Sequence, residues 1–249
     1  MSAQKDDVTE DRLLGGRIIV RQPRAGFRVA IDTVLLAAAV PAEDGQTVFE
    51  PGAGIGAAAL CLAQRVPGCR VVGLEVQADL VRLAAENVRL NAMERRIDVM
   101  VGEIAHPPPR LVPGAYDHVM MNPPFLEAAR AQPPDAAALA GARIEGDAGL
   151  ASWIGLALAM LRRKGTVTLI HRADRLADVL AALGGGAGEI VVFPLWPRHG
   201  EGPAKRVLVR ARRGVASPLR LARGMVLHAA DGAFTPLADA VLRGGPLEL

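Results

Sequence analysis

The 249-residue sequence predicts an α/β fold, and three observations lead to that prediction. From residue 47 onward, short apolar segments of strand length alternate with segments whose apolar residues recur at helical spacing. A glycine-rich turn, residues 52–56, stands between the first such strand and the first helix. Acidic or amide residues follow the next strands directly. Together these features predict a Rossmann-like, doubly wound sheet of seven mainly parallel strands.

The strands are predicted where apolar runs lie between turn residues. The seven strands are residues 47–50, 70–74, 97–101, 116–121, 167–170, 190–193 and 206–210. The helices are predicted from periodicity, as in the second one, where Leu80, Leu83 and Val88 fall on one face. The predicted helices are residues 57–64, 78–90, 147–163, 174–183 and 236–242.

Turn residues set the expected ends of these helices. Pro67-Gly68 closes the first helix, and Gly184 begins a run of three glycines that ends the fourth. Asp147 is the expected N-cap of the third helix, and Gly165 follows its end. The preceding residues 127–146, rich in Ala and Pro, are predicted to form a mobile loop or lid.

We expect one main domain with two flanking segments. Residues 47–215 would form the α/β core, residues 1–46 a basic N-terminal extension, and residues 216–249 a C-terminal strand and helix tail packed on the same domain. Because 51% of the residues are hydrophobic and only 3% are aromatic, we expect the core to be mostly aliphatic.

Targeting, membrane and metal signals are weak in this sequence. The N-terminus carries acids where a signal peptide needs an apolar run. The apolar run 29–40 is interrupted by Asp32 and is shorter than the about 20 residues that span a bilayer. Cys61 and Cys69 lack CxxC spacing, and the five histidines are scattered. We therefore expect a soluble, cytoplasmic protein with no membrane partner and no metal site, and the sequence leaves its oligomeric state open.

Charge is distributed unevenly, although the net charge is only +3. Residues 12–31 are rich in arginine, residues 202–230 are rich in Lys and Arg, and neither stretch contains an acid. Such stretches favour a polyanionic partner such as RNA, although solvated strand and loop faces are the alternative. The candidate RNA-contacting residues are Arg21, Arg24, Arg28, Arg198, Lys205, Arg206, Arg210, Arg212 and Arg213.

The glycine turn and the acids that follow the strands suggest an adenosine ligand. Glycines at 52–56 let the backbone approach a ligand closely at a helix start. Glu75, which ends the second strand, can accept hydrogen bonds from both hydroxyls of a ribose. Glu103 ends the third strand and can accept a hydrogen bond from an adenine amino group, while Ile104 packs on the ring. NAD would explain the glycines and Glu75, but it leaves the next motif without a role.

The motif Asn122-Pro123-Pro124-Phe125 directly follows the fourth strand. The N6 amino group of adenine is a poor nucleophile because its lone pair is delocalised into the ring. The Asn122 side-chain oxygen and the Pro123 carbonyl can accept its two N–H groups and so align the lone pair. The prolines stiffen the backbone, and Phe125 offers a face for an extruded base. The motif predicts the capture of a planar, amino-bearing group, with a strand-ending turn and a core Phe as the alternative.

With these residues, the chain resembles the class I S-adenosylmethionine-dependent methyltransferases that carry a D/N-P-P-Y/F motif. Within them it is most similar to the bacterial tRNA1(Val) adenine-37 N6-methyltransferase family. The resemblance covers residues 24–215, including the segments 29–36, 50–56, 85–87, 94–97, 122–125 and 205–209. It implies the class I methyltransferase fold, S-adenosylmethionine as cofactor, and methyl transfer to an exocyclic amino group, most specifically adenine N6 in tRNA.

The resemblance also implies roles for individual residues. Asn122, Pro123, Pro124 and Phe125 would hold the target adenine. The N-terminal segment would close over the cofactor. The residues implied in cofactor binding are Asp32, Thr33, Glu50, Gly52, Ala53, Gly54, Gly56, Glu75, Val76, Glu103, Ile104 and Asn122.

Several other functions remain open from the sequence. Guanine N2 methylation of ribosomal RNA would use the same core. A protein glutamine N5-methyltransferase typically has a helical N-terminal substrate domain, and too few residues precede the first strand for one. A DNA adenine methyltransferase would usually need an added recognition domain. A non-catalytic RNA-binding protein with a similar pocket is the alternative from another class.

Overall fold

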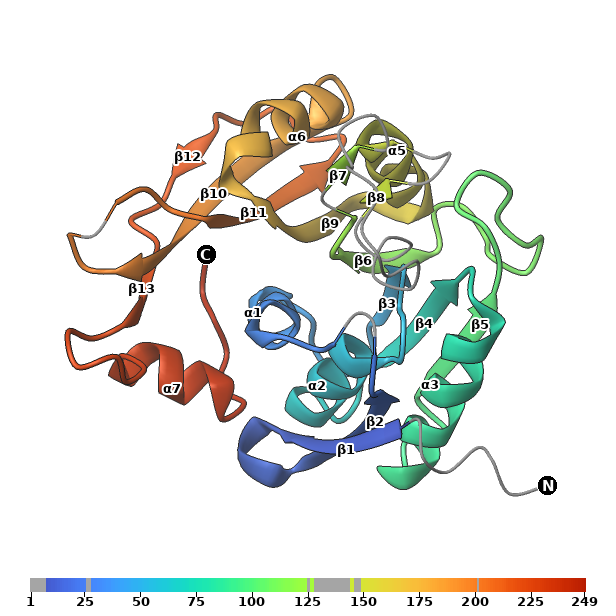
Figure 1. Cartoon of the computed structure of the whole chain (residues 1–249). Coiled ribbons are helices and arrows are strands. Elements are labelled where there is room, and N and C mark those ends of the chain that lie inside the picture. Colours follow the sequence, from blue (N-terminus) through green and yellow to red (C-terminus); the bar gives the residue numbers. More distant parts are fainter. Residues whose placement is uncertain (1–7, 26–27, 125, 128–143, 146–148, 201) are drawn as a thin grey trace.

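The computed structural model describes residues 8–25, 28–124, 126–127, 144–145, 149–200 and 202–249 (Figure 1). Within these residues, a nine-stranded sheet forms the centre of the molecule. Its strand order is β12-β10-β11-β9-β6-β3-β4-β5, and β13 also pairs with β10. The bounds are β3 Thr47–Pro51, β4 Arg70–Glu75, β5 Ile97–Val101, β6 Tyr116–Met121, β9 Leu161–Arg172, β10 Ala187–Arg198, β11 Arg206–Arg213, β12 Arg220–Leu221 and β13 Met225–His228.

The mainly parallel sheet confirms the predicted fold class. Strands β5, β4, β3, β6 and β9 run parallel to one another, whereas β11 is antiparallel to both β9 and β10. All seven predicted strands are present. The two additional short strands, β12 and β13, come from the C-terminal tail and pair in parallel with β10.

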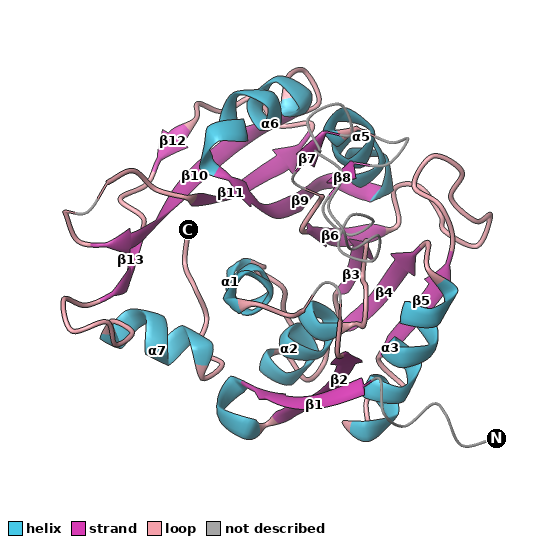
Figure 2. Cartoon of the chain, viewed as in Figure 1, coloured by secondary structure: helices cyan, strands magenta, loops and turns pink. Residues whose placement is uncertain are grey.

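Helices cover both faces of this sheet (Figure 2). On one face lie α1 (Ile31–Ala39), α2 (Ala57–Arg65), α3 (Ala78–Leu90) and α7 (Pro236–Leu242), which share one apolar cluster. On the other face, α5 (Leu150–Met160) and α6 (Leu176–Leu183) share a second cluster with the sheet. The shorter elements are η1 (Leu14–Gly16), η3 (Ala173–Arg175), β7 (Leu126–Glu127) and β8 (Ile144–Glu145).

The helix predicted over residues 147–163 ends earlier than expected. Helix α5 stops at Met160, and β9 begins at Leu161. Tyr116 of β6 pairs with Leu161, and the Leu161 carbonyl accepts a hydrogen bond from Arg213. A local helical pattern cannot predict these long-range contacts. The pairing of β9 with β6 at Leu161 therefore ends the helix before the pattern does. The expected N-cap, Asp147, lies outside the described residues.

The N-terminal segment contains a β-hairpin that the sequence analysis did not predict. Strands β1 (Val8–Leu13) and β2 (Ile18–Pro23) pair antiparallel and form a sheet separate from the central one. Along β2, buried and half-buried residues alternate, as expected for a strand with one covered face. Figure 1 shows this hairpin beside α2 and α3.

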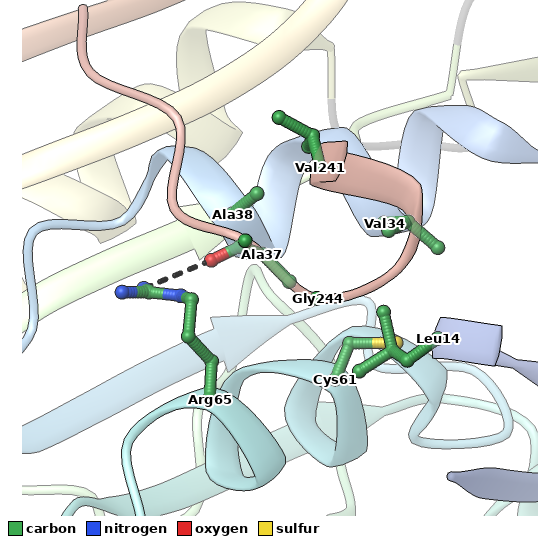
Figure 3. A pocket seen from close by; sticks show the side chains of 9 residues that line it. Leu14, Val34, Ala37, Ala38, Cys61, Arg65, Val241 and Gly244 are labelled. Carbon is green, nitrogen blue, oxygen red and sulfur yellow. Dashed lines mark hydrogen bonds between the residues drawn. The ribbon is translucent and has the colours of Figure 1, made fainter. Parts of the chain in front are cut away.

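A small cavity of about 10 Å³ lies between α1, α2 and the chain after α7 (Figure 3). Beside it, the Arg65 guanidinium donates to the carbonyl of Ala37 at 3.1 Å and to that of Val40. Burial lowers the pKa of Arg65, but the carbonyl end of α1 is a favourable place for a cation. The cavity is large enough for no more than about one water, so ligand binding must be sought elsewhere.

The described helices include none that is both long enough and apolar enough to cross a membrane.

Candidate functional site

A pocket of about 430 Å³ opens at the carboxyl ends of β3, β4, β5 and β6. This is the edge at which ligands bind in open α/β sheets. The strand-end loops supply Glu50, Gly52, Ala53, Gly54, Ile55, Glu75, Val76, Gly102, Ile104, Asn122, Pro123 and Pro124. The N-terminal segment adds Pro23, Ala25, Val29 and Thr33, and α5 adds Trp153.

The glycine loop after β3 shapes one wall of the pocket. Gly52 and Gly54 have φ angles of 70° and 53°, in the left-handed region that favours glycine. A Cβ on Gly52 would lie 2.6 Å from the Trp153 ring, whereas a Cβ on Gly54 would meet nothing within 4 Å. Gly52 therefore makes room for the indole, and the Gly54 backbone faces open space that a ligand can fill.

Glu75 is held in place by the backbone around it. One carboxylate oxygen accepts a hydrogen bond from the Gly54 N–H at 3.0 Å, and the other accepts one from the Gln77 N–H at 2.9 Å. The residue is buried, at 7% relative exposure, yet it lines the pocket. Each carboxylate oxygen retains a lone pair, so Glu75 can accept two further hydrogen bonds from a ligand diol.

Glu50 lies at the end of β3 and is buried. Burial raises the pKa of its carboxyl group to about 8, the N–H of Ala59 lowers the pKa through a hydrogen bond, and the nearby Glu75 raises it. Within the described residues, its Oε2 atom is buried and has no hydrogen-bond partner. A buried acid with one unsatisfied oxygen is suited to a cationic ligand, which would stabilise the ionised form.

Asn122 follows β6, and its Oδ1 atom is also buried without a hydrogen-bond partner among the described residues. Pro123 and Pro124 continue the wall of the pocket, while Phe125 lies outside the described residues. Behind this segment, at the end of β9, His171 is fully buried. Burial lowers the pKa of His171 to about 4, although a hydrogen bond with the Pro124 backbone opposes the shift. A neutral imidazole therefore supports the proline segment.

Three residues implied in cofactor binding, Asp32, Gly56 and Glu103, lie outside the pocket wall. Gly56 is the N-cap of α2. Asp32 forms an ion pair with Arg206 at 2.9 Å, whereas its neighbour Thr33 lines the pocket. Glu103 is exposed, and its carboxylate lies 3.6 Å from His106. The residues on either side of Glu103, Gly102 and Ile104, line the pocket instead.

Sequence reasoning missed several pocket residues, of which Trp153 is the most prominent. It lies on α5, far from the motifs in sequence, and the signal that could have revealed it is its rarity as one of two tryptophans. Pro23, Ala25 and Val29 belong to the N-terminal segment but were not singled out. In the sequence, His171 is only one of five scattered histidines. Its position next to Pro124 depends on the pairing of β6 with β9.

Most of the candidate RNA-contacting arginines have partners within the fold. Arg21 lies 3.6 Å from Glu10, Arg28 donates to Asp11 at 2.8 Å, and Arg206 is paired with Asp32. The remaining partners are the Leu249 carbonyl for Arg210, Glu189 and the Lys164 carbonyl for Arg212, and the Ala159 and Leu161 carbonyls for Arg213. Arg24 and Arg198 also have interactions within the fold, and Lys205 is exposed.

The basic residues of β11 lie at different distances from the pocket edge of the sheet. Arg206 is paired in register with Arg172, at the carboxyl end of β9 and therefore at the pocket edge of the sheet. Arg212 is paired with Thr166, six residues back along β9, which places it about 20 Å from that edge. Arg213 is paired with Ala187, at the start of β10. Arg212 and Arg213 therefore do not share a surface with the pocket mouth.

Comparison with known proteins decides among the possible ligands of such a pocket. Residues 26–140 match the family model described as Methyltransferase small domain. The chain is 27% identical to a predicted O-methyltransferase from Agrobacterium tumefaciens of known structure, covering 88% of this chain and 99% of that one with a TM-score of 0.74. These matches show the class I methyltransferase fold and methyltransferase activity.

Named relatives agree with this methyltransferase assignment. The chain is 28% identical over 87% of its length to the tRNA1(Val) (adenine(37)-N6)-methyltransferase of Aeromonas hydrophila, and it covers 89% of that relative. It is 33% identical to the protein of the same name from Proteus mirabilis over 45% of each chain. The tRNA (m1A58) methyltransferase TrmI of Aquifex aeolicus, at 13% identity and a TM-score of 0.57, shares the fold.

The cofactor of this methyltransferase is S-adenosylmethionine, and the pocket residues fit it. Glu50 offers a buried, unsatisfied carboxyl oxygen suited to a cationic ligand, and Glu75 offers fixed acceptors suited to a diol. Gly54 leaves space along the backbone between them. These chemical features match the amino acid and ribose parts of S-adenosylmethionine.

Proposed function

We propose that this methyltransferase transfers the methyl group of S-adenosylmethionine to the N6 amino group of an adenine in tRNA. The observation that carries the proposal is Asn122, whose side-chain oxygen is buried at the pocket wall with its hydrogen-bonding capacity unused within the described residues. An acceptor in this state is costly unless a ligand N–H satisfies it. The names of the relatives, which specify adenine N6 in a tRNA, also support the proposal.

Asn122 and Pro123 would orient the target amino group. The Asn122 Oδ1 atom accepts one N–H of the amine, and the Pro123 carbonyl accepts the other, so that the nitrogen lone pair points toward the cofactor. S-adenosylmethionine supplies an electrophilic methyl carbon bound to a positively charged sulfur. The amine nitrogen would take up the methyl group as the C–S bond breaks with its electron pair going to sulfur, and the amine would then lose a proton to water.

The other pocket residues would bind and enclose the cofactor. Glu50 holds its cationic end, Glu75 accepts hydrogen bonds from its ribose, and Ile104 packs on its adenine. Thr33 lines the pocket and belongs to the segment 1–46, which we propose closes over the cofactor. We further propose that the tail, 216–249, belongs to the same domain as the core, since β12 and β13 extend its sheet.

The RNA would approach at the pocket mouth. Arg24 lies between two pocket-lining residues, Pro23 and Ala25, and Arg206 lies at the carboxyl edge of the sheet. Lys205 is exposed beside Arg206. We propose these three, together with Arg28 and Arg198, as the phosphate-contacting residues. Contacts of this kind strengthen binding without reading sequence.

Methyl transfer into unmodified RNA tests the proposed substrate. Labelled S-adenosylmethionine is incubated with tRNA and with ribosomal RNA that lack their own modifications, and the digested nucleosides are identified by mass. We expect N6-methyladenosine in the tRNA with the wild type and none with Asn122→Ala. Label in 2-methylguanosine of ribosomal RNA, label in a ribose hydroxyl group, or no label in either RNA would contradict the proposal.

A further inference from the structure

The N-terminal hairpin is attached by two asparagine side chains, one on α3 and one at the C-cap of α3, rather than by another strand. Asn87 accepts the Arg21 N–H at 2.7 Å and donates to the Arg21 carbonyl at 2.9 Å. Asn91 accepts the Ile19 N–H at 3.0 Å and donates to the Ile19 carbonyl at 2.7 Å. Each side-chain amide thus bonds to both backbone groups of one β2 residue.

The spacing of the two asparagines matches the spacing of the strand. Residues four apart on a helix are separated by about 6 Å along its axis, and residues two apart on a strand by about 6.6 Å. Asn87 and Asn91 therefore meet Arg21 and Ile19 in register. They satisfy the edge of β2 that β1 does not cover, which would otherwise present unpaired backbone groups.

Asn87 makes one more contact, which Asn91 does not share. Its Nδ2 also donates to the carbonyl of Ile55, in the glycine loop, at 3.1 Å. Asn87 is fully buried, and Ile55 lines the cofactor pocket. One amide therefore connects the glycine-loop wall of the pocket to β2.

The hairpin continues directly into another part of the pocket wall. Strand β2 ends at Pro23, which lines the pocket together with Ala25 and Val29. Gln22 accepts the Val29 N–H at 2.8 Å and donates to Asp11 at 2.6 Å, so the hairpin also holds the segment that leads into α1. The position of β2 thus fixes the position of this wall.

We propose that Asn87 is a positioning residue for cofactor binding, which holds the glycine loop and the hairpin wall at the separation that S-adenosylmethionine requires. The proposal rests on the assignment of this pocket to the cofactor. It does not depend on the RNA substrate, because the cofactor can be bound without it. Loss of the Asn87 amide would let the two walls move independently, which weakens cofactor binding.

Asn91 provides a matched control for Asn87. Each side chain makes three hydrogen bonds, two of them to one β2 residue, and the third goes to the Ile55 carbonyl for Asn87 and to the Asn87 carbonyl for Asn91. Titration calorimetry with S-adenosylhomocysteine would compare the wild type, Asn87→Ala and Asn91→Ala, with Tm measured for each. We expect Kd to rise about tenfold in Asn87→Ala and no more than about twofold in Asn91→Ala. Equal increases in the two variants, or no increase in Asn87→Ala, would overturn the proposal.

A measurement on the wild type decides the matter if Asn87→Ala does not fold. Amide hydrogen exchange, followed by NMR with and without S-adenosylhomocysteine, reports on single residues of β2. Because Asn87 connects the glycine loop to Arg21, we expect cofactor binding to protect the Arg21 amide more than the Ile19 amide. No change at Arg21, or equal protection of both amides, would contradict the role of Asn87. A failure to methylate tRNA would leave both binding experiments unaffected.

Discussion

The pocket and the arginines of β11 differ in how their polar groups are satisfied. In the pocket, Glu50 Oε2 and Asn122 Oδ1 are buried, and neither has a hydrogen-bond partner among the described residues. On β11, Arg206, Arg210 and Arg212 each bind an acid or a carbonyl of the same chain. Both regions contain polar side chains that the sequence marks as functional. Of these two regions, only the pocket has buried side-chain atoms that lack a hydrogen-bond partner among the described residues.

This difference shows which kind of sequence signal carries functional information here. Burying a polar atom without a partner costs about 1–3 kcal/mol, so such an atom at the wall of a large pocket indicates a ligand that supplies the missing bond. A cluster of arginines has no such cost, because an arginine can stabilise the fold by binding a carbonyl or a carboxylate. The basic composition of residues 202–230 therefore predicts partners less reliably than the motifs at the strand ends.

Changing Asn122 should have the largest effect on activity. In Asn122→Ala the acceptor for the target amine is lost, and we expect kcat/KM to fall by about a hundredfold or more, as for the removal of one transition-state hydrogen bond. Asn122→Asp keeps two acceptor oxygens and should lose less. Binding of S-adenosylhomocysteine, measured by calorimetry, should change by no more than about threefold in either variant. A loss of cofactor binding equal to the loss of activity would show that Asn122 acts on the cofactor instead.

Changing Glu50 should alter the pH dependence of stability. The folded-state pKa is raised from 4.5 to about 8, so between these values the unfolded chain has lost the proton that the folded protein still holds. The free energy of unfolding of the cofactor-free wild type should therefore fall as pH rises through this range. The free energy of unfolding of Glu50→Gln should not fall in this way, because a glutamine side chain does not titrate. We expect this variant to be more stable than the wild type at about pH 8, by on the order of 4 kcal/mol, and nearly equally stable at about pH 5.

Urea denaturation of both proteins at the two pH values measures this difference. The same substitution should weaken binding of S-adenosylhomocysteine, because a glutamine cannot ionise to balance the ammonium group of this ligand. Higher stability combined with weaker binding is the pattern expected for a buried acid kept for a ligand. Parallel stability profiles for the two proteins would show that Glu50 is not held protonated by burial.

The sequence correctly predicts the elements that local residue patterns determine. It does not predict features that depend on contacts between residues far apart in the chain. The bounds of α3 and α7 agree with the predicted 78–90 and 236–242, because periodicity and end signals lie within the segments. The β1–β2 hairpin was missed because its free edge is satisfied by Asn87 and Asn91, more than 60 residues away. The pocket wall formed by Trp153 was missed for the same reason, since its neighbour Gly52 lies on another element.

The smallest predicted effect separates the two ends of β11. Lys205 is exposed at the pocket edge, whereas Arg212 lies toward the other edge and is bound to Glu189. We expect Lys205→Ala to weaken tRNA binding about threefold and to lower the slope of log affinity against log salt by about one. Arg212→Ala should leave both quantities unchanged and lower Tm slightly, because an exposed ion pair contributes little to stability.

Filter binding over a range of salt concentrations measures both slopes with the same tRNA. Equal losses of affinity in Lys205→Ala and Arg212→Ala would mean that the RNA covers both edges of the sheet. The distinction between the satisfied arginines and the unsatisfied pocket atoms would then fail for the basic residues, since an intramolecular partner would not prevent a phosphate contact. A loss confined to Lys205→Ala would support RNA entry at the pocket mouth.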